Sequence, residues 1–284
     1  MEISEYLTRI NLKGADNTLF KREEREVKLV KDGKESLTKI LGINSYTFFE
    51  NGSGAVLGFI RYEKEFPEQV FALDPEVLQK VMEISDSITI EDTFLVGKTK
   101  YGDVKRDLKF MKWRRASGKY ENDPLTLKHE LIQGILDRNS VIDSSYVTIV
   151  GDGTNLRLTL FPKIGQGTAQ INIPSEINTD CRFESTMFME ILKLTGSSDA
   201  RLYLDIPNPE DRKTSPMRLD VTDKNAQITY YLTQAAVEMS QVASESEPKK
   251  KSKKEKKEAE KEPEKEPETD EKESEEESIE SMEL

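Results

Sequence analysis

Histidine, cysteine and tryptophan are almost absent from this chain, since each occurs once in 284 residues. A single cysteine, Cys181, cannot form an intrachain disulfide, which fits a reducing compartment. The single histidine, His129, is far from that cysteine in sequence, so the pair gives no zinc-type spacing. His129 also stands between Lys128 and Glu130 on a predicted helix, where a solvated surface side chain is the simplest interpretation. We therefore predict no catalytic residue, metal site or cofactor, and an enzyme is the weakest function class.

Long apolar runs are missing as well. No stretch approaches the roughly 18–20 apolar residues that span a bilayer, and the first residues lack the apolar segment of a signal peptide. The sequence therefore predicts a soluble intracellular protein with no membrane partner, in the cytoplasm or the nucleus according to the organism.

Charge, in contrast, is abundant and uneven, with 34% of residues charged. Residues 243–284 contain 10 Lys, 17 Asp and Glu, and no aromatic residue. Such a segment buries too little apolar surface to offset its ordering entropy, so residues 235–284 are predicted to be a disordered tail. Residues 98–119 have the opposite bias, with nine Lys and Arg against two Asp. This basic stretch is either a solvated hairpin and linker or a patch that contacts phosphates.

One supersecondary unit recurs along the chain. Short strands that begin at residues 71, 125 and 181 lead into amphipathic helices at about 74–84, 128–139 and 185–195, and β-prone runs follow each helix. A weaker copy, with a strand at 25–30 and a helix at 32–41, precedes them. Because one such unit cannot bury its helix stripe alone, the repeat predicts an α+β fold of two similar domains built from strand-helix-three-strand units.

Turn and capping signals place several boundaries. Asn51 to Gly54 separates two β-prone runs and indicates a hairpin. Asp74-Pro75 is a helix start, and Gly196 stands where a left-handed residue ends a helix. The polar run 114–124 is predicted to connect an N-terminal domain, residues 1–113, to a C-terminal domain, residues 125–234. Residues 1–24 show no clear pattern beyond a possible strand at 6–12.

The end of the second predicted domain resembles a known family. Pro216-Met217 opens a strand, and after a polar turn the final strand contains Tyr230-Tyr231-Leu232. This arrangement is similar to the end of DNA sliding clamps of the archaeal and eukaryotic type, the proliferating cell nuclear antigen family. Residues 183–204 and 107–111 agree with the family's last helix and strand and with its strand before the connector. The resemblance covers about residues 25–234. It implies a ring of three copies, in which helices line the central hole and antiparallel sheets form the outer wall.

The resemblance also implies a function in DNA replication and repair. The ring would enclose double-stranded DNA without sequence preference and act as a polymerase processivity factor. It would be loaded by a clamp loader and would tether DNA polymerase, nuclease and ligase. Only loose phosphate contacts are needed for sliding. The residues expected to face DNA are Lys80, Lys128, Arg157 and Lys193.

A pocket for partner peptides is expected beside the last strand, beneath the connector. Its candidate residues are Tyr231, Leu232, Thr233 and Gln234. The family usually continues with Ala-Pro where this chain has Thr233-Gln234, and the Lys/Glu-rich tail is longer than is usual, so the choice of partners is left open. Two alternatives remain at this stage: a subunit of a heteromeric or checkpoint clamp, and a repeat β-rich scaffold that binds only proteins.

Overall fold

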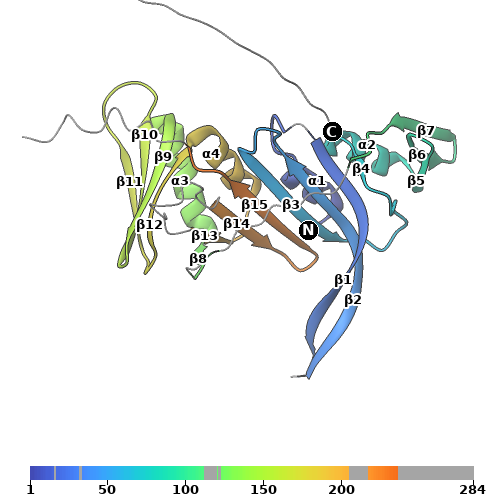
Figure 1. Cartoon of the computed structure of the whole chain (residues 1–284), viewed down its shortest axis with the longest axis horizontal. Coiled ribbons are helices and arrows are strands. Elements are labelled where there is room, and N and C mark those ends of the chain that lie inside the picture. The colour runs from blue at the N-terminus through green and yellow to red at the C-terminus, as the bar shows by residue number, and fades with distance from the viewer. Residues whose placement is uncertain (16, 32–33, 112–119, 121–122, 205–216, 236–284) are drawn as a thin grey trace, which may run out of the picture. The chain divides into compact units, whose positions relative to one another are not determined.

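Four helices and fifteen strands make up the described part of the chain: three strands follow each helix, and one further strand leads into each of the last three helices. The structure is a computed structural model (Figure 1) that describes residues 1–15, 17–31, 34–111, 120, 123–204 and 217–235. The first two units contain α1 (Ile3–Ile10), β1 (Asn17–Lys31), β2 (Lys34–Phe48) and β3 (Gly54–Arg61), then β4 (Phe71–Ala72), α2 (Pro75–Ile84), β5 (Ser87–Glu91), β6 (Phe94–Thr99) and β7 (Gly102–Asp107). The last two contain β8 (Leu125–Leu127), α3 (His129–Ile142), β9 (Ser144–Asp152), β10 (Asn155–Pro162) and β11 (Ala169–Pro174), then β12 (Asn178–Glu184), α4 (Ser185–Leu194), β13 (Ala200–Tyr203), β14 (Met217–Thr222) and β15 (Ala226–Leu232). The predicted α+β class and the repeated unit are confirmed.

The first unit differs from the prediction at its helix. Residues 6–12, considered as a strand, lie mostly in helix α1, which buries Tyr6, Leu7 and Ile10. These three follow a helical i, i+1, i+4 spacing, and Arg9 pairs with Glu5 one turn earlier. The helix of the first repeat is therefore at residues 3–10.

The predicted helix at 32–41 is wrong, because these residues belong largely to strand β2. Every residue of β2 pairs with one of β1, from Asn17 opposite Phe48 to Lys31 opposite Lys34. Only Gly42–Phe48 of β2 also pairs with β3. Beyond that point the two strands pair only with each other among the described residues, and they can be followed as a long hairpin in Figure 1.

Three antiparallel sheets hold the fifteen strands of the described ranges. The largest has the order β4-β1-β2-β3-β15-β14-β13-β8, and the others are β11-β10-β9-β12 and β5-β6-β7. The β3–β15 pairing joins strands from the two predicted domains, with Ala55 opposite Tyr231. Most of the predicted connector, and the tail from residue 236, lie outside the described residues, so these boundaries stay predictions.

The helices contact one another in the row α2-α1-α4-α3. At the α1–α4 contact, the buried Tyr230 hydroxyl donates to the backbone oxygens of Arg9 and Leu194, both at 3.1 Å. Arg9 is only 6% exposed and donates to Ser198 beyond the end of α4. Gly196 has the left-handed φ of 61° that its position predicted, and a Cβ there would lie 2.6 Å from the Arg9 guanidinium. The Tyr230 side chain of β15 thus links α1 and α4, which are far apart in sequence.

Candidate partner-binding site

Aromatic side chains gather on the face of the eight-stranded sheet that points away from α1. On β2, the Ser45 hydroxyl forms a 2.6 Å hydrogen bond with the Tyr6 hydroxyl of α1. Side chains alternate along a strand, so the neighbouring Tyr46 points to the opposite face. There Tyr46 stacks on Phe48, with ring centroids 5.1 Å apart. Together with Tyr231 they belong to a small apolar cluster separate from the main core.

A pocket of about 520 Å³ opens over this cluster. We call it the apolar pocket. It is lined by Tyr46, Phe48, Phe49, Glu50, Gly52, Gly54, Ala55, Met111, Tyr231 and Thr233. Burial raises the pKa of the Tyr231 phenol, against the opposing effect of the nearby Arg218 guanidinium, so this hydroxyl is neutral and able to donate at physiological pH. Aromatic walls with a few polar groups suit the insertion of an apolar side chain from a peptide.

Thr233 closes one rim of the apolar pocket. Its hydroxyl donates to the Gly52 carbonyl at 2.7 Å, and its backbone N–H donates to the Ser53 carbonyl at 3.0 Å. The end of β15 is thereby tied to the turn between β2 and β3. Thr233 therefore holds this rim in place.

The structure brings together only half of the predicted pocket residues. Tyr231 and Thr233 line the apolar pocket, whereas Leu232 is 2% exposed and belongs to the main core on the other face of the sheet. The Gln234 amide donates to the Cys181 sulfur at 3.4 Å, on β12, and does not line the pocket. The binding role of all four residues stays a prediction.

Sequence reasoning missed the pocket residues Tyr46, Phe48 and Met111. A signal was present on β2, where aromatic residues at 46 and 48 alternate with the polar residues Ser45 and Thr47. This alternation predicts a strand with one buried face, but it does not tell which face meets the helices. In the structure the polar Ser45 and Thr47 face α1. Met111 lies just before the predicted connector.

A second group of aromatic residues includes Tyr120, which lies within the predicted connector. Tyr120 packs on Tyr203 of β13, with ring centroids 5.7 Å apart. Arg218 of β14 lies 4.7 Å from the Tyr203 ring and forms two hydrogen bonds, of 2.8 and 2.6 Å, with Asp220. Arg218 is also the cross-strand partner of Tyr231. Tyr120 thus packs on β13, which is separated from the pocket strand β15 by β14.

The residues predicted to face DNA lie in three different settings. Lys80 on α2 and Lys193 in the last turn of α4 are exposed. Lys128, just before α3, is exposed but donates at 2.7 Å to Asp199, which also accepts from the His129 backbone N–H. This ion pair raises the pKa of Lys128 and lowers that of Asp199. Acidic side chains share these helices, Glu83 on α2 and Glu130 on α3 among them, so the helix surfaces are mixed in charge.

Arg157 does not join the helix lysines. On β10 it alternates with Leu156 and Leu158, which are buried in the main core, and α3 packs on this strand. Arg157 is exposed and therefore points to the face of the four-stranded sheet away from the helices. Its cross-strand neighbour Val150 is also exposed there.

The described residues contain no group of three or more His, Cys, Asp or Glu side chains placed to hold a metal ion. Within the same ranges, no helix has the length and apolar character needed to cross a membrane.

Comparisons with known proteins identify the fold of this chain. No protein-family model matches the sequence, and no curated protein does. A solved structure of A. fulgidus PCNA with the C-terminal region of FEN-1 bound matches with a TM-score of 0.58 and 14% identity, over 83% of this chain and 95% of that chain. PCNA from Entamoeba histolytica matches with a TM-score of 0.56 and 11% identity, over 82% and 96%. The chain therefore has the sliding-clamp fold of PCNA.

Proposed function

We propose that this protein is a DNA sliding clamp, a ring that encloses duplex DNA and tethers replication and repair enzymes without catalysis of its own. The observation that carries the proposal is the clamp fold together with the apolar pocket on the sheet face opposite α1. In this reading DNA polymerase, clamp loader, nuclease and ligase are the partners, and no cofactor takes part.

Ring closure would use sheet edges. Strands β7 and β11 each end a sheet in the described part of the chain. Pairing β7 of one copy with β11 of the next would make one continuous sheet and remove two exposed edges. Three copies joined in this way form the homotrimeric ring that we propose.

The row of helices α2-α1-α4-α3 would make only weak contacts with DNA. Lys80 and Lys193 are exposed cations on α2 and α4, and the acidic side chains nearby keep the attraction weak. Weak, sequence-independent contacts to phosphates suit a ring that slides, since tight binding would stop it. We keep Lys128 as a weaker contributor because Asp199 holds it, and we leave out Arg157 because of its position on the sheet.

Encirclement is tested by comparing circular with linear DNA. We expect the loaded protein to stay on nicked circular DNA after a salt wash and to leave the same DNA within minutes once it is cut, because a ring slides off free ends. Blocking both ends with a bulky protein should restore retention. Replacing Lys80 and Lys193 by Ala should lower loading and leave the oligomer intact. Equal retention on circular and open linear DNA would contradict the proposal.

The apolar pocket is tested with a peptide. The C-terminal region of A. fulgidus FEN-1 is a suitable probe, because that segment is bound to a PCNA of the same fold. We expect it to bind the wild type and to bind Tyr231→Ala roughly 30-fold more weakly, since loss of a central aromatic wall costs about 2 kcal/mol or more. Fluorescence anisotropy measures the change. Tyr101→Ala is the matched control, because Tyr101 is 88% exposed and outside the pocket. If Tyr231→Ala and Tyr101→Ala bind the peptide with equal affinity, Tyr231 is not part of the binding site.

A further inference from the structure

One strand of the structure lacks the neighbour that its counterparts have. In three of the four repeat units, the first strand after the helix pairs with the strand that leads into the helix of the neighbouring unit: β1 with β4, β9 with β12 and β13 with β8. Strand β5 has the same place after α2, but among the described residues it pairs only with β6. We call its other side, along Ser87–Glu91, the β5 edge.

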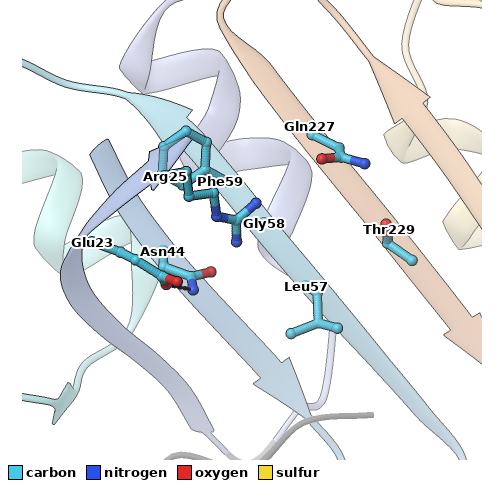
Figure 2. A pocket seen from close by; sticks show the side chains of 8 residues that line it. All are labelled: Glu23, Arg25, Asn44, Leu57, Gly58, Phe59, Gln227 and Thr229. Atoms are coloured by element: carbon cyan, nitrogen blue, oxygen red, sulfur yellow. Dashed lines mark hydrogen bonds between the residues drawn. The ribbon is translucent and has the colours of Figure 1, made fainter. Parts of the chain in front are cut away.

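The eight-stranded sheet shows how strands of different units fill such positions. There β3 has a neighbour on each side, since Phe59 is the cross-strand partner of Asn44 on β2 and Leu57 that of Thr229 on β15. Figure 2 shows these three strands side by side, around a pocket of about 330 Å³. The outer strands of this sheet, β4 and β8, have only two and three residues, which limits the backbone that they expose. The β5 edge has five residues, enough to pair with a further strand.

The three lead strands β4, β8 and β12 show which side chains fit beside such an edge. Each places an apolar side chain in the core: Phe71 on β4 and Phe183 on β12 are fully buried, and Leu127 on β8 is 2% exposed. Cys181, two residues before Phe183 and on the same face of β12, is buried as well. All three lead strands run antiparallel to their neighbour. A segment at the β5 edge should therefore be an antiparallel strand with apolar residues at alternate positions.

Apolar side chains near the β5 edge remain partly in contact with water. Ile88 of β5 is buried in the main core, whereas Ile90, two residues further on the same face, is only half-buried. Ile84, three residues before β5 at the end of α2, is 59% exposed. A strand added here would place its own apolar side chains beside Ile90 and remove this surface from water.

Acidic side chains stand at both ends of β5. Asp86 precedes the strand and Asp92 follows it; both are exposed, and neither forms an ion pair within the described ranges. Glu91, in contrast, lies 3.9 Å from Lys98 and 3.7 Å from Lys105. The two unpaired carboxylates favour a strand with Lys or Arg at each end, about six residues apart. Because exposed ion pairs contribute little stability, these charges select the partner more than they tighten its binding.

We propose that the β5 edge is a docking site for an extended segment of a partner protein, which adds a fourth, antiparallel strand to the three-stranded sheet. The segment has two apolar residues at alternate positions, between Lys or Arg residues about six positions apart. Backbone hydrogen bonds supply the affinity, and the side chains supply the specificity. The basic stretch of this chain's own tail, residues 249–257, does not fit, because it contains no apolar residue. The inference rests on the fold and is independent of the apolar pocket.

Peptide selection followed by hydrogen exchange tests the proposal. A displayed library of random 12-residue peptides is selected against the full-length wild type, and the peptides that bind Tyr231→Ala equally well are kept, so that ligands of the apolar pocket are removed. We expect the remaining peptides to contain the alternating apolar pair between basic residues. Their binding should slow amide exchange at residues 87–91 of the wild type, measured by mass spectrometry.

A charge-reversal variant tests the expected basic ends. Asp86→Lys with Asp92→Lys should bind these peptides about three- to tenfold more weakly and keep its fold, because both residues are exposed and unpaired in the described part of the chain. Glu176→Lys with Asp180→Lys is the matched control, since it changes the charge equally at exposed positions in or beside the four-stranded sheet. Equal affinity for the two double variants would overturn the predicted role of the acidic ends.

Hydrogen exchange also decides between the possible occupants. If no peptide is enriched, or if the enriched peptides bind without slowing exchange at residues 87–91, the β5 edge is not a docking site. Slow exchange there in the free wild type would mean that the protein covers its own edge and would equally overturn a separate partner. Protection that is lost on dilution then identifies a second copy, and protection that is lost on truncation after Gln241 identifies the tail. Failure of the peptide test at Tyr231 leaves this inference unchanged.

Discussion

At the tip of the β9–β10 hairpin, one carboxylate organises the turn. Asp152 Oδ1 accepts from the Thr154 backbone N–H at 2.9 Å, the Thr154 hydroxyl at 2.7 Å and the Asn155 backbone N–H at 2.8 Å. These donors stabilise the ionised form and lower the pKa of Asp152 from 3.8 to about 2. Three short contacts at an exposed site thus matter more than the small effect of burial, which acts in the other direction.

Acid should weaken this turn in a defined pH range. The folded pKa is below the unfolded one, so the stabilisation by Asp152 is complete above about pH 4 and is lost as the pH falls towards 2. The melting temperature of Asp152→Ala should be below that of the wild type at pH 6, and the difference should shrink between pH 4 and pH 2. Carboxyl ¹³C shifts should give a pKa of about 2 for Asp152, and Thr154→Ala should raise it. An ordinary pKa in the wild type would show that the turn does not hold the carboxylate.

Among the elements, the β1–β2 hairpin is the one whose structure could not be predicted from the sequence. Helices α2, α3 and α4 were predicted because their caps and apolar stripes are local: Asp74 accepts from two N–H groups of α2, and Gly196 follows α4. Residues 37, 40 and 41 show a helical spacing too, but pairing with β1 decides their structure. Such pairing is set by distant residues and cannot be read from a local period. The same limit hid Tyr46 and Phe48, because the face they occupy depends on the register of β2.

A glycine substitution tests how tightly this hairpin packs on β3. In Gly42→Ala the new Cβ would lie 2.3 Å from the Ile60 backbone oxygen and 2.5 Å from the Phe59 ring. We expect a loss of about 1–3 kcal/mol in the free energy of unfolding, as in other overpacked sites, measured by urea denaturation. Gly134→Ala on α3 is the matched control. Its Cβ would meet only the flexible Arg138 guanidinium, at 3.2 Å, and helix propensity favours Ala by up to about 1 kcal/mol. Equal stability of Gly42→Ala and the wild type would mean that β2 and β3 pack more loosely than described.

At the scale of the whole molecule, the exposed sheet edges determine whether the protein stays a monomer or associates with further copies. In the described part of the chain, the outer edges of β7 and β11 have no strand partner, and exposed edges favour association. On β7 the exposed Lys105 and Arg106 are balanced by the exposed Asp103 and Asp107, whereas β11 has the exposed and uncharged Gln170 and Asn172. Neither edge has a net charge that would oppose pairing, but lysines added to β11 would face Lys105 and Arg106.

Two lysines added to β11 should therefore prevent closure of the ring. The double variant Gln170→Lys with Asn172→Lys places two cations opposite the strand that contains Lys105 and Arg106 in the neighbouring copy. Light scattering at micromolar concentration should give about three chains per particle for the wild type and one for the variant, because like charges that face each other across strands are destabilising. Circular dichroism should show the same fold in both. The control Gln133→Lys with Ser140→Lys adds equal charge to exposed positions on α3 and should stay trimeric. A wild type that remains monomeric at high concentration would exclude the homotrimer and favour a ring completed by a different subunit, whereas a trimer that survives both lysines would place the interface on other strands.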